Sequence, residues 1–241
     1  MLSIIIPTLN EEDYLPILLK SIKNQTFNTY EIIVADAGSK DKTVEIAKKF
    51  GCKITTGGLP AKGKNEGAKV ARGEFYLFLD ADLKLPNNFL KNSIEEFKKR
   101  NLEVASYCLI PQTNKKILKN GFEFFYNRPV TFLQNFIPHG AMGILVKEKI
   151  FQRVGGFDER IKLAEDHYFV RQAAKIGRFG IIESTKIYIT LRRFETDGYL
   201  STLFKYLLCY LFMFSGKGVK SDIFKYRFNH YSKNKKHTII Q

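Results

Sequence analysis

The sequence predicts an α/β protein whose mostly parallel sheet is flanked by helices. Two observations lead to this fold class. Short β-branched runs alternate with segments whose apolar residues recur at helical spacing through the first half of the chain. Polar turns separate these runs, and this order is typical of a parallel sheet with both faces covered. With 241 residues, the chain has room for one large domain, or for one domain with an appendage.

The predicted elements follow one another in a regular order. Strands are expected at residues 2–8 (LSIIIPT), 30–39 (YEIIVADAGS), 52–57 (CKITTG) and 74–82 (EFYLFLDAD). A helix is expected after each of them, at residues 13–26, 40–51, 62–73 and 87–100. Gly51 is a suitable stop for the second helix, and the third is rich in small residues. A further strand is expected at residues 185–190 (TKIYIT).

Polar turns follow three of these strands. Their sequences are PTLNEE, ADAGSKDKT and DADLKLP. Because ligands bind at the carboxyl ends of parallel strands, we expect the three turns to lie on one rim of the sheet. Neither a G-x-G-x-x-G turn after the first strand nor a Walker A lysine loop is found in the sequence. Dinucleotide oxidoreductases and P-loop enzymes are therefore disfavoured.

Two aspartates, Asp80 and Asp82, follow the apolar run of the fourth strand. If the chain turns at Ala81, both carboxylates can reach one hard cation, and Mg²⁺ or Mn²⁺ typically adds water and substrate phosphates to such ligands. The alternative is that Asp82 caps the next helix or turn and Asp80 pairs with a lysine. The position after a buried strand favours a site for a metal diphosphate.

Four motifs occur in a fixed order along the chain, namely SIIIPTLNEE, VADAGSKDKT, AKGKNEGAKVARGEFYLFLDAD and VGGFDERIKLAEDHYFVRQAAKIG. In these motifs and their order the chain resembles the family-2 glycosyltransferases, inverting enzymes with the GT-A fold that use nucleotide-diphosphate sugars. The resemblance covers about residues 2 to 195 and implies a GT-A domain at residues 1–197. It also implies a UDP- or GDP-sugar donor and a divalent metal, Mg²⁺ or Mn²⁺.

The resemblance also implies roles for residues in the first three motifs. It puts Pro7, Thr8 and Glu11 beside the nucleoside. Asp36 should accept a hydrogen bond from the base, and Lys64 should lie near the diphosphate. Two alternatives stay open: Glu11 favours the start of the first helix through the helix dipole, and Asp36 is an Asx-turn residue.

At the metal motif, the resemblance implies that Asp80 and Ala81 face the nucleotide sugar, with Asp80 and Asp82 at the metal. Asp166, with Glu165 beside it, is implied to be the catalytic base. The alternative is that both residues of this E-D pair are exposed charges on an ordinary helix. His139 is more often a structural or acceptor-side histidine than a base.

The E-D pair favours a hydroxyl acceptor, such as a glycan or a lipid-linked saccharide. A hydroxyl has a high pKa and benefits from a base, whereas a phosphate monoester is already ionised near neutrality. Transfer to a polyprenyl phosphate remains an alternative. A sugar-phosphate nucleotidyltransferase is less well supported, because PTLNEED is not the glycine-rich, arginine-containing loop expected of one. A binding module without catalysis is supported only by net charge.

The last quarter of the chain departs from the processive pattern, because no Q-x-x-R-W string is present. After the last expected strand, Arg192 and Arg193 could close over phosphates of the donor or of a lipid-linked acceptor. The alternative is that both arginines pair with surface acids.

The net charge of +15 favours an anionic partner. Residues 199–214 form an apolar run, interrupted by Lys205 and shorter than the roughly 20 residues of a spanning helix. A basic tail follows. We therefore expect residues 198–241 to form an amphipathic apolar helix with a basic tail, which associates with an anionic membrane surface rather than with nucleic acid. A solvated tail, or a helix packed on the catalytic domain, is the alternative.

Scattered cysteines without metal spacing indicate reduced thiols. The N-terminus lacks the basic region and the cleavage site of a signal peptide. The predicted location is therefore cytoplasmic, peripheral at the inner face of the cell membrane.

Overall fold

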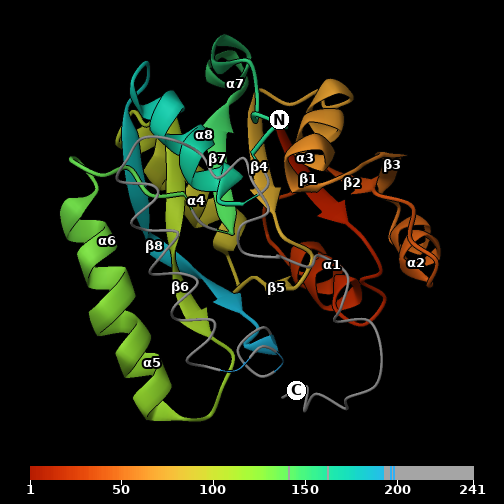
Figure 1. Ribbon diagram of the computed structural model, residues 1–241, viewed down its shortest axis with the longest axis horizontal. Coiled ribbons are helices and arrows are strands. Elements are labelled where there is room, and N and C mark those ends of the chain that lie inside the picture. The colour runs from red at the N-terminus through yellow and green to blue at the C-terminus, as the bar shows by residue number, and fades with distance from the viewer. Residues whose placement is uncertain (141, 162, 193–195, 197, 199–241) are drawn as a thin grey trace.

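A sheet of eight strands forms the centre of the computed structural model, which describes residues 1–140, 142–161, 163–192, 196 and 198 (Figure 1). The strands are β1 (Leu2–Thr8), β2 (Tyr30–Asp36), β3 (Lys53–Thr56), β4 (Phe75–Leu79), β5 (Leu83–Lys84), β6 (Val104–Pro111), β7 (Gly143–Lys147) and β8 (Phe179–Ile189). Their order across the sheet is β3-β2-β1-β4-β7-β6-β8-β5.

Helices cover the sheet. They are α1 (Leu15–Lys23), α2 (Thr43–Lys49), α3 (Pro60–Lys69), α4 (Phe89–Lys99), α5 (Lys116–Phe122), α6 (Arg128–Leu133), α7 (Glu148–Val154) and α8 (Glu165–Ala174). A π-helical turn, η1 (Glu123–Asn127), joins α5 to α6. The predicted fold class is confirmed as a mixed α/β fold with a curled sheet between helices.

The first four predicted strands form a parallel sheet. Strand β1 pairs in parallel with β2 and β4, and β2 pairs in parallel with β3. The other half of the sheet is mixed, because β7 runs antiparallel between β4 and β6, and the short β5 is antiparallel to β8. Thr8 and Asp36 are register partners at the ends of β1 and β2. The carboxyl ends of these strands therefore meet at one rim, as the sequence predicts.

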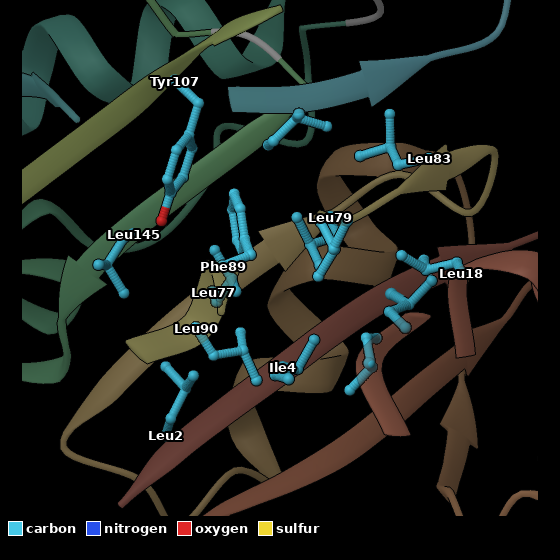
Figure 2. Close-up of a cluster of buried hydrophobic side chains, with 14 of the residues drawn as sticks. Leu2, Ile4, Leu18, Leu77, Leu79, Leu83, Phe89, Leu90, Tyr107 and Leu145 are labelled. Carbon is cyan, nitrogen blue, oxygen red and sulfur yellow. The ribbon is translucent and has the colours of Figure 1, made fainter. Parts of the chain in front are cut away.

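Alternating side chains of β1 divide the interior into two cores. Leu2 and Ile4 belong to a cluster that also contains residues of α1 and α4, and Figure 2 shows side chains of this cluster, Leu18, Leu77 and Phe89 among them. Ile5 belongs to a second cluster that contains residues of α3, α7 and α8. This alternation follows from the period of two in a strand. Helices α3 and α8 therefore share one face of the sheet.

Small residues let α3 approach β1 closely. A Cβ at Gly63 would lie 2.9 Å from the Pro7 Cβ, and a Cβ at Gly67 would meet the Ile5 side chain. The two glycines are one helical turn apart and face the strand. The small residues of this predicted helix thus bring the Lys64 segment against the sheet.

No helix in the described part of the chain is long and apolar enough to cross a membrane. The predicted amphipathic helix and basic tail, as well as Arg193, lie outside the described residues.

Candidate active site

The loops after β1 and β2 are joined by hydrogen bonds at the rim of the sheet. The Asn10 amide donates to Ser39 Oγ at 2.8 Å, and the Glu11 amide donates to Thr43 Oγ1 at 2.7 Å. Asn10 itself has a φ of +54°, a left-handed conformation that asparagine tolerates better than most residues. These contacts hold Glu11 in place before any ligand is present.

Asp36 uses both carboxylate oxygens to shape the turn after β2. Its Oδ1 accepts from Thr8 Oγ1 at 3.0 Å and from Ser39 Oγ at 2.6 Å. Its Oδ2 accepts from the amides of Gly38 at 2.9 Å and Ser39 at 2.8 Å. A carboxylate offers about four acceptor sites. The Asx turn is therefore formed, and a base that bonds to Asp36 must replace one of these donors.

The turn after β4 carries the two predicted metal ligands. Ala81 is buried in the larger core, while Asp80 and Asp82 are partly exposed on either side of it. Thr190 Oγ1 donates to Asp82 Oδ2 at 3.1 Å. The chain thus turns at Ala81, which is the condition for both carboxylates to share one ligand.

A single guanidinium connects the turns after β1 and β4. Arg192 makes a two-pronged contact with Glu11, at 2.9 Å and 2.8 Å, and its Nε lies 2.9 Å from Asp82 Oδ2. The guanidinium also lies 4.6 Å from the centre of the Tyr14 ring. Burial raises the pKa of Glu11 to about 7, and Arg192 opposes this increase. We call this arrangement the Glu11–Arg192–Asp82 bridge.

Lys64 lies beside the E-D pair, although more than 100 residues separate them in the sequence. Its ammonium is 2.9 Å from Glu165 Oε1 and contacts Asp166 Oδ1. Lys64 is 2% exposed. Burial lowers its pKa, but Asp166, Glu165 and Asp80 outweigh burial and raise it. We call these three side chains of Lys64, Glu165 and Asp166 the Lys64 cluster.

The pKa of Asp166 is raised well above its usual range. Burial is the main cause; the Lys64 ammonium works against the increase, and the Glu165 and Asp80 carboxylates add to it. One cation is therefore shared by three neighbouring carboxylates. Asp166 is a stronger base than an exposed aspartate as a result.

Backbone geometry fixes the start of α8, where Asp166 lies. Ala164, directly before the helix, has a φ of +61°, which is strained for a residue with a Cβ. Upstream, Gly155 and Gly156 have φ values of +83° and +77°. The Asn65 side chain bonds the Phe157 amide and carbonyl, both at 2.9 Å. The GGFDE turn is thereby tied to α3 next to Lys64.

A glycine opposite α8 also positions Asp166. A Cβ at Gly140 would lie 2.5 Å from the Asp166 carbonyl oxygen and 2.9 Å from Val170 Cγ2. The neighbouring His139 is buried, with its Nε2 2.7 Å from the Tyr126 hydroxyl and its ring 4.2 Å from that of His167. These contacts hold the His139 ring in place beside His167, the residue that follows Asp166.

Asp80 connects the two groups of charges. Its carboxylate raises the pKa values of Glu11, Lys64 and Asp166, so it lies within electrostatic range of both the bridge and the Lys64 cluster. Predicted site residues from all four motifs therefore meet at one rim of the sheet. Pro7 and Thr8 end β1 in the same place.

The family model for Glycosyl transferase family 2 matches residues 3–159, more than half of the chain. The chain belongs to glycosyltransferase family 2. An uncharacterised glycosyltransferase of Rickettsia typhi is 31% identical over 181 residues, which are 69% of this chain and 56% of that protein. The family and the enzyme class that the motifs indicate are thus confirmed.

Two other curated relatives have named substrates. TarS of Staphylococcus aureus, a poly(ribitol-phosphate) beta-N-acetylglucosaminyltransferase, is 26% identical over 204 residues, 79% of this chain and 35% of its own. A GalNAc(5)-diNAcBac-PP-undecaprenol beta-1,3-glucosyltransferase of Campylobacter jejuni is 34% identical over 118 residues, 45% of this chain and 38% of its own. This family-2 chain spans 35% to 56% of the length of the first curated relatives that it matches.

Solved structures show the same fold. TarS residues 1–349 with UDP-GlcNAc match with a TM-score of 0.64 at 24% identity, over 78% of this chain and 58% of that one. The mannosyltransferase PcManGT from Pyrobaculum calidifontis with GDP-Man and Mn²⁺ matches with a TM-score of 0.63 at 20% identity, over 78% and 56%. The fold of this family-2 chain is therefore the GT-A fold.

Several residues of the family-2 site are not indicated by sequence spacing. Tyr14 and Thr190 contact the bridge, whereas Asn65 and Gly140 position the Lys64 cluster. Tyr14 lies just after the first motif and Asn65 lies within the third, whereas Gly140 and Thr190 lie outside all four motifs. Each of the four contacts a distant part of the chain. Of these residues, only Asn65 could have been selected from the sequence, because it directly follows Lys64 in the third motif.

The partly buried bridge is expected to stabilise this family-2 domain. Arg192→Met should lower the free energy of unfolding by roughly 2 kcal/mol, because it leaves the partly buried Glu11 and Asp82 carboxylates without their cation. The double variant Arg192→Met/Glu11→Gln should recover part of this loss. Urea unfolding measures both values. Arg160→Met removes an exposed guanidinium and should cost at most about 1 kcal/mol. Equal losses for the two arginines would contradict the expected difference.

The base role that the family resemblance implies for Asp166 predicts that transfer increases with pH through the range in which Asp166 loses its proton, because a general base acts only when deprotonated. Glu165→Gln removes a carboxylate that raises the pKa of Asp166. The acidic limb of kcat/KM against pH should therefore move to lower pH. Glu45→Gln, at an exposed pair with Lys49, is the matched control and should leave the limb in place. An unmoved limb in Glu165→Gln would count against this coupling.

Proposed function

We propose that this chain is an inverting glycosyltransferase that moves a sugar from a UDP- or GDP-sugar to a hydroxyl group. The proposed acceptor is a glycan or a lipid-linked saccharide. The observation that supports this most strongly is the position of Asp166: a buried carboxylate with a raised pKa, within electrostatic range of Asp80 in the D-x-D turn. Transfer to a hydroxyl requires a general base and a binding site for the sugar donor close together, and in this chain the residues proposed for both lie on one rim of the sheet.

In this proposal, Asp166 accepts the proton of the acceptor hydroxyl. The hydroxyl oxygen forms a bond to the anomeric carbon as the bond between that carbon and the diphosphate oxygen breaks, and the nucleoside diphosphate leaves. Lys64 holds the Asp166 carboxylate through their direct contact. Because Lys64 is also close enough to Asp80 to act on it, its charge is available to the diphosphate side of the site.

On the donor side, we propose that the nucleoside lies over the loops after β1 and β2, against Pro7, Thr8 and Glu11. Hydrogen bonds between these loops preorganise them. Asp36 supports the loop by accepting four hydrogen bonds from Thr8, Gly38 and Ser39. We propose that the nucleobase replaces one of these donors when the nucleoside binds. Arg192 stands beside Glu11 and Asp82, where a guanidinium can pair with phosphate oxygens in two-pronged geometry.

The proposed metal ligands are Asp80 and Asp82. Their oxygen atoms fit Mg²⁺ or Mn²⁺, which are commonly held by one or two carboxylates together with substrate phosphates. Among the described residues, no group of three or more possible metal-binding side chains is found. In this proposal, oxygen atoms of the donor diphosphate and water complete the coordination. The metal supplies Lewis-acid stabilisation of the leaving diphosphate when bound.

The proposed acceptor class has support from a relative and from the site. The C. jejuni relative is named for transfer to a saccharide on undecaprenol diphosphate. In this chain, the raised pKa of Asp166 suits a hydroxyl, which must lose a proton, better than an ionised phosphate.

We infer that the enzyme works at the periphery of a membrane, on its cytoplasmic side.

A thermal-shift panel tests the proposed donor. The purified chain is heated with UDP, GDP, UDP-sugars and GDP-sugars, with and without Mn²⁺. One nucleotide class should raise the Tm, and more so with Mn²⁺, because a ligand that binds the folded state stabilises it by mass action. Stabilisation by a nucleoside triphosphate with a sugar phosphate, accompanied by pyrophosphate release, would identify a nucleotidyltransferase and overturn the proposal.

A further inference from the structure

Large apolar side chains are exposed on one segment of the described chain. Six of the nine exposed large hydrophobic residues lie within twenty positions, namely Ile117, Phe124, Phe125, Phe132, Leu133 and Phe136. Four of these six are about 80% exposed. Such a concentration on a protein surface marks an interaction site.

This segment is a helical arm along the edge of the molecule, formed by α5, η1 and α6 (Figure 1). Its inner side is fixed to the sheet. The Asn127 side chain bonds the Leu109 amide and carbonyl of β6, both at 2.9 Å, and Val130 is buried against Cys108 and Ile181. The orientation of the arm is thus set by buried contacts, and the opposite side faces outward.

The outward side combines aromatic rings with positive charge. Lys115, Lys116 and Lys119 are exposed at the start of the arm, and the Arg128 guanidinium lies 5.9 Å from the Phe124 ring centre. The one acid between residues 115 and 136 is Glu123, which pairs with Lys186 at 2.8 Å. We call the side formed by these exposed apolar and basic residues the aromatic face.

We propose that the aromatic face binds the surface of an anionic lipid bilayer. Exposed Phe and Ile side chains beside Lys and Arg are the pattern of helices that lie in a membrane interface. Charge argues against two other occupants of the aromatic face, a second copy of the chain and the chain's own residues 199–241. A second copy would bring the same positive charge to the contact, and residues 199–241 carry eight Lys or Arg and one Asp. An anionic surface complements the positive charge of the face.

This surface is formed by other residues than the predicted tail, and it does not depend on the proposed reaction. It lies on the described part of the chain, and its binding can be measured without donor or acceptor. Because insertion of apolar rings and attraction of charges contribute separately, the face should show two signatures. Removing rings should weaken binding at any salt concentration, and removing lysines should weaken the preference for anionic lipid.

Sedimentation of the full chain with phospholipid vesicles tests the proposal. Phe125→Ser/Phe132→Ser should lower the partition coefficient on phosphatidylglycerol-containing vesicles at least roughly tenfold, because each ring loses a large part of its apolar burial. The matched control is Leu59→Ser/Ile176→Ser, which removes two exposed apolar side chains elsewhere. This control should bind as the unaltered chain does.

A second pair tests the charges. Lys116→Gln/Lys119→Gln should reduce binding to anionic vesicles several-fold at low salt, whereas Lys20→Gln/Lys48→Gln, also exposed, should not. Undiminished binding of the phenylalanine variant would overturn the proposal, since the tail alone would then account for binding. Increased binding of the phenylalanine variant would overturn it too. That result would mean that the rings pack on another apolar segment of the chain, which their removal frees to bind lipid. Absence of vesicle binding by the unaltered chain would have the same consequence.

Discussion

Replacing Asp166 with Asn is expected to lower the rate of sugar transfer by roughly 10² to 10⁴-fold, with donor affinity nearly unchanged. The amide has the size of the carboxylate but cannot accept the acceptor proton. The fold should tolerate the change, because Lys64 keeps its contact with Glu165 at 2.9 Å. Initial-rate kinetics with saturating donor would measure the effect as a loss in kcat.

Two controls separate base catalysis from disturbance of the cluster. Glu165→Gln alters the same ion pair but keeps Asp166, so it should retain far more activity at a pH above the acidic limb. Gly140→Ala displaces the Asp166 backbone, because its Cβ would lie 2.5 Å from that carbonyl oxygen; it should lower kcat without removing any charge. Full turnover of the Asp166→Asn enzyme would remove Asp166 from the mechanism.

Alanine at Asp80 or Asp82 is expected to abolish transfer and to weaken metal-dependent donor binding. Both carboxylates lie on the turn at Ala81, and Asp80 acts electrostatically on Glu11, Lys64 and Asp166. Calorimetric titration with the nucleotide diphosphate, with and without Mn²⁺, measures the loss. In the unaltered enzyme, excess chelator should reproduce it.

Glu45→Ala is the control for this pair, because it removes an exposed carboxylate that pairs with Lys49. Donor affinity should not change in this variant. Asp82→Ala also releases Arg192 from one of its two carboxylates, so its unfolding free energy must be measured beside its affinity. Full activity of the unaltered enzyme in excess chelator would show that the metal assignment is wrong.

Much of the fold can be predicted from the sequence because its information is local. The β-branched runs and helical spacing between Leu2 and Lys99 correspond in order to β1 to β4 and α1 to α4, whereas the short β5 between β4 and α4 was not predicted. The antiparallel β7 could not be predicted to lie between β4 and β6, because strand order depends on contacts between distant segments. Nor does any local pattern indicate the π-helical turn that carries Phe124 and Phe125.

The candidate site was predictable at the level of residue types and motifs, but not of contacts. The motifs point to Lys64 and Asp166 separately, yet their direct contact depends on how closely α3 packs on β1 through Gly63 and Gly67. Asp36 is a second example. A carboxylate suits a contact with the nucleobase, and the sequence shows this much, but the four hydrogen bonds that Asp36 accepts from the protein depend on how the two loops fold. One alternative for Arg192 was that it pairs with surface acids. It does pair with acids, but these are Glu11 and Asp82 of the candidate site.

The anomeric configuration of the product tests the central claim most directly. One base that faces the acceptor, with the diphosphate leaving from the opposite side of the sugar, requires a single displacement. Proton NMR of the product, recorded before any mutarotation, reports the configuration through the coupling of its anomeric proton. The account predicts a configuration opposite to that of the donor sugar. A product with the donor's configuration would contradict it, because retention needs a second displacement or attack from the diphosphate side.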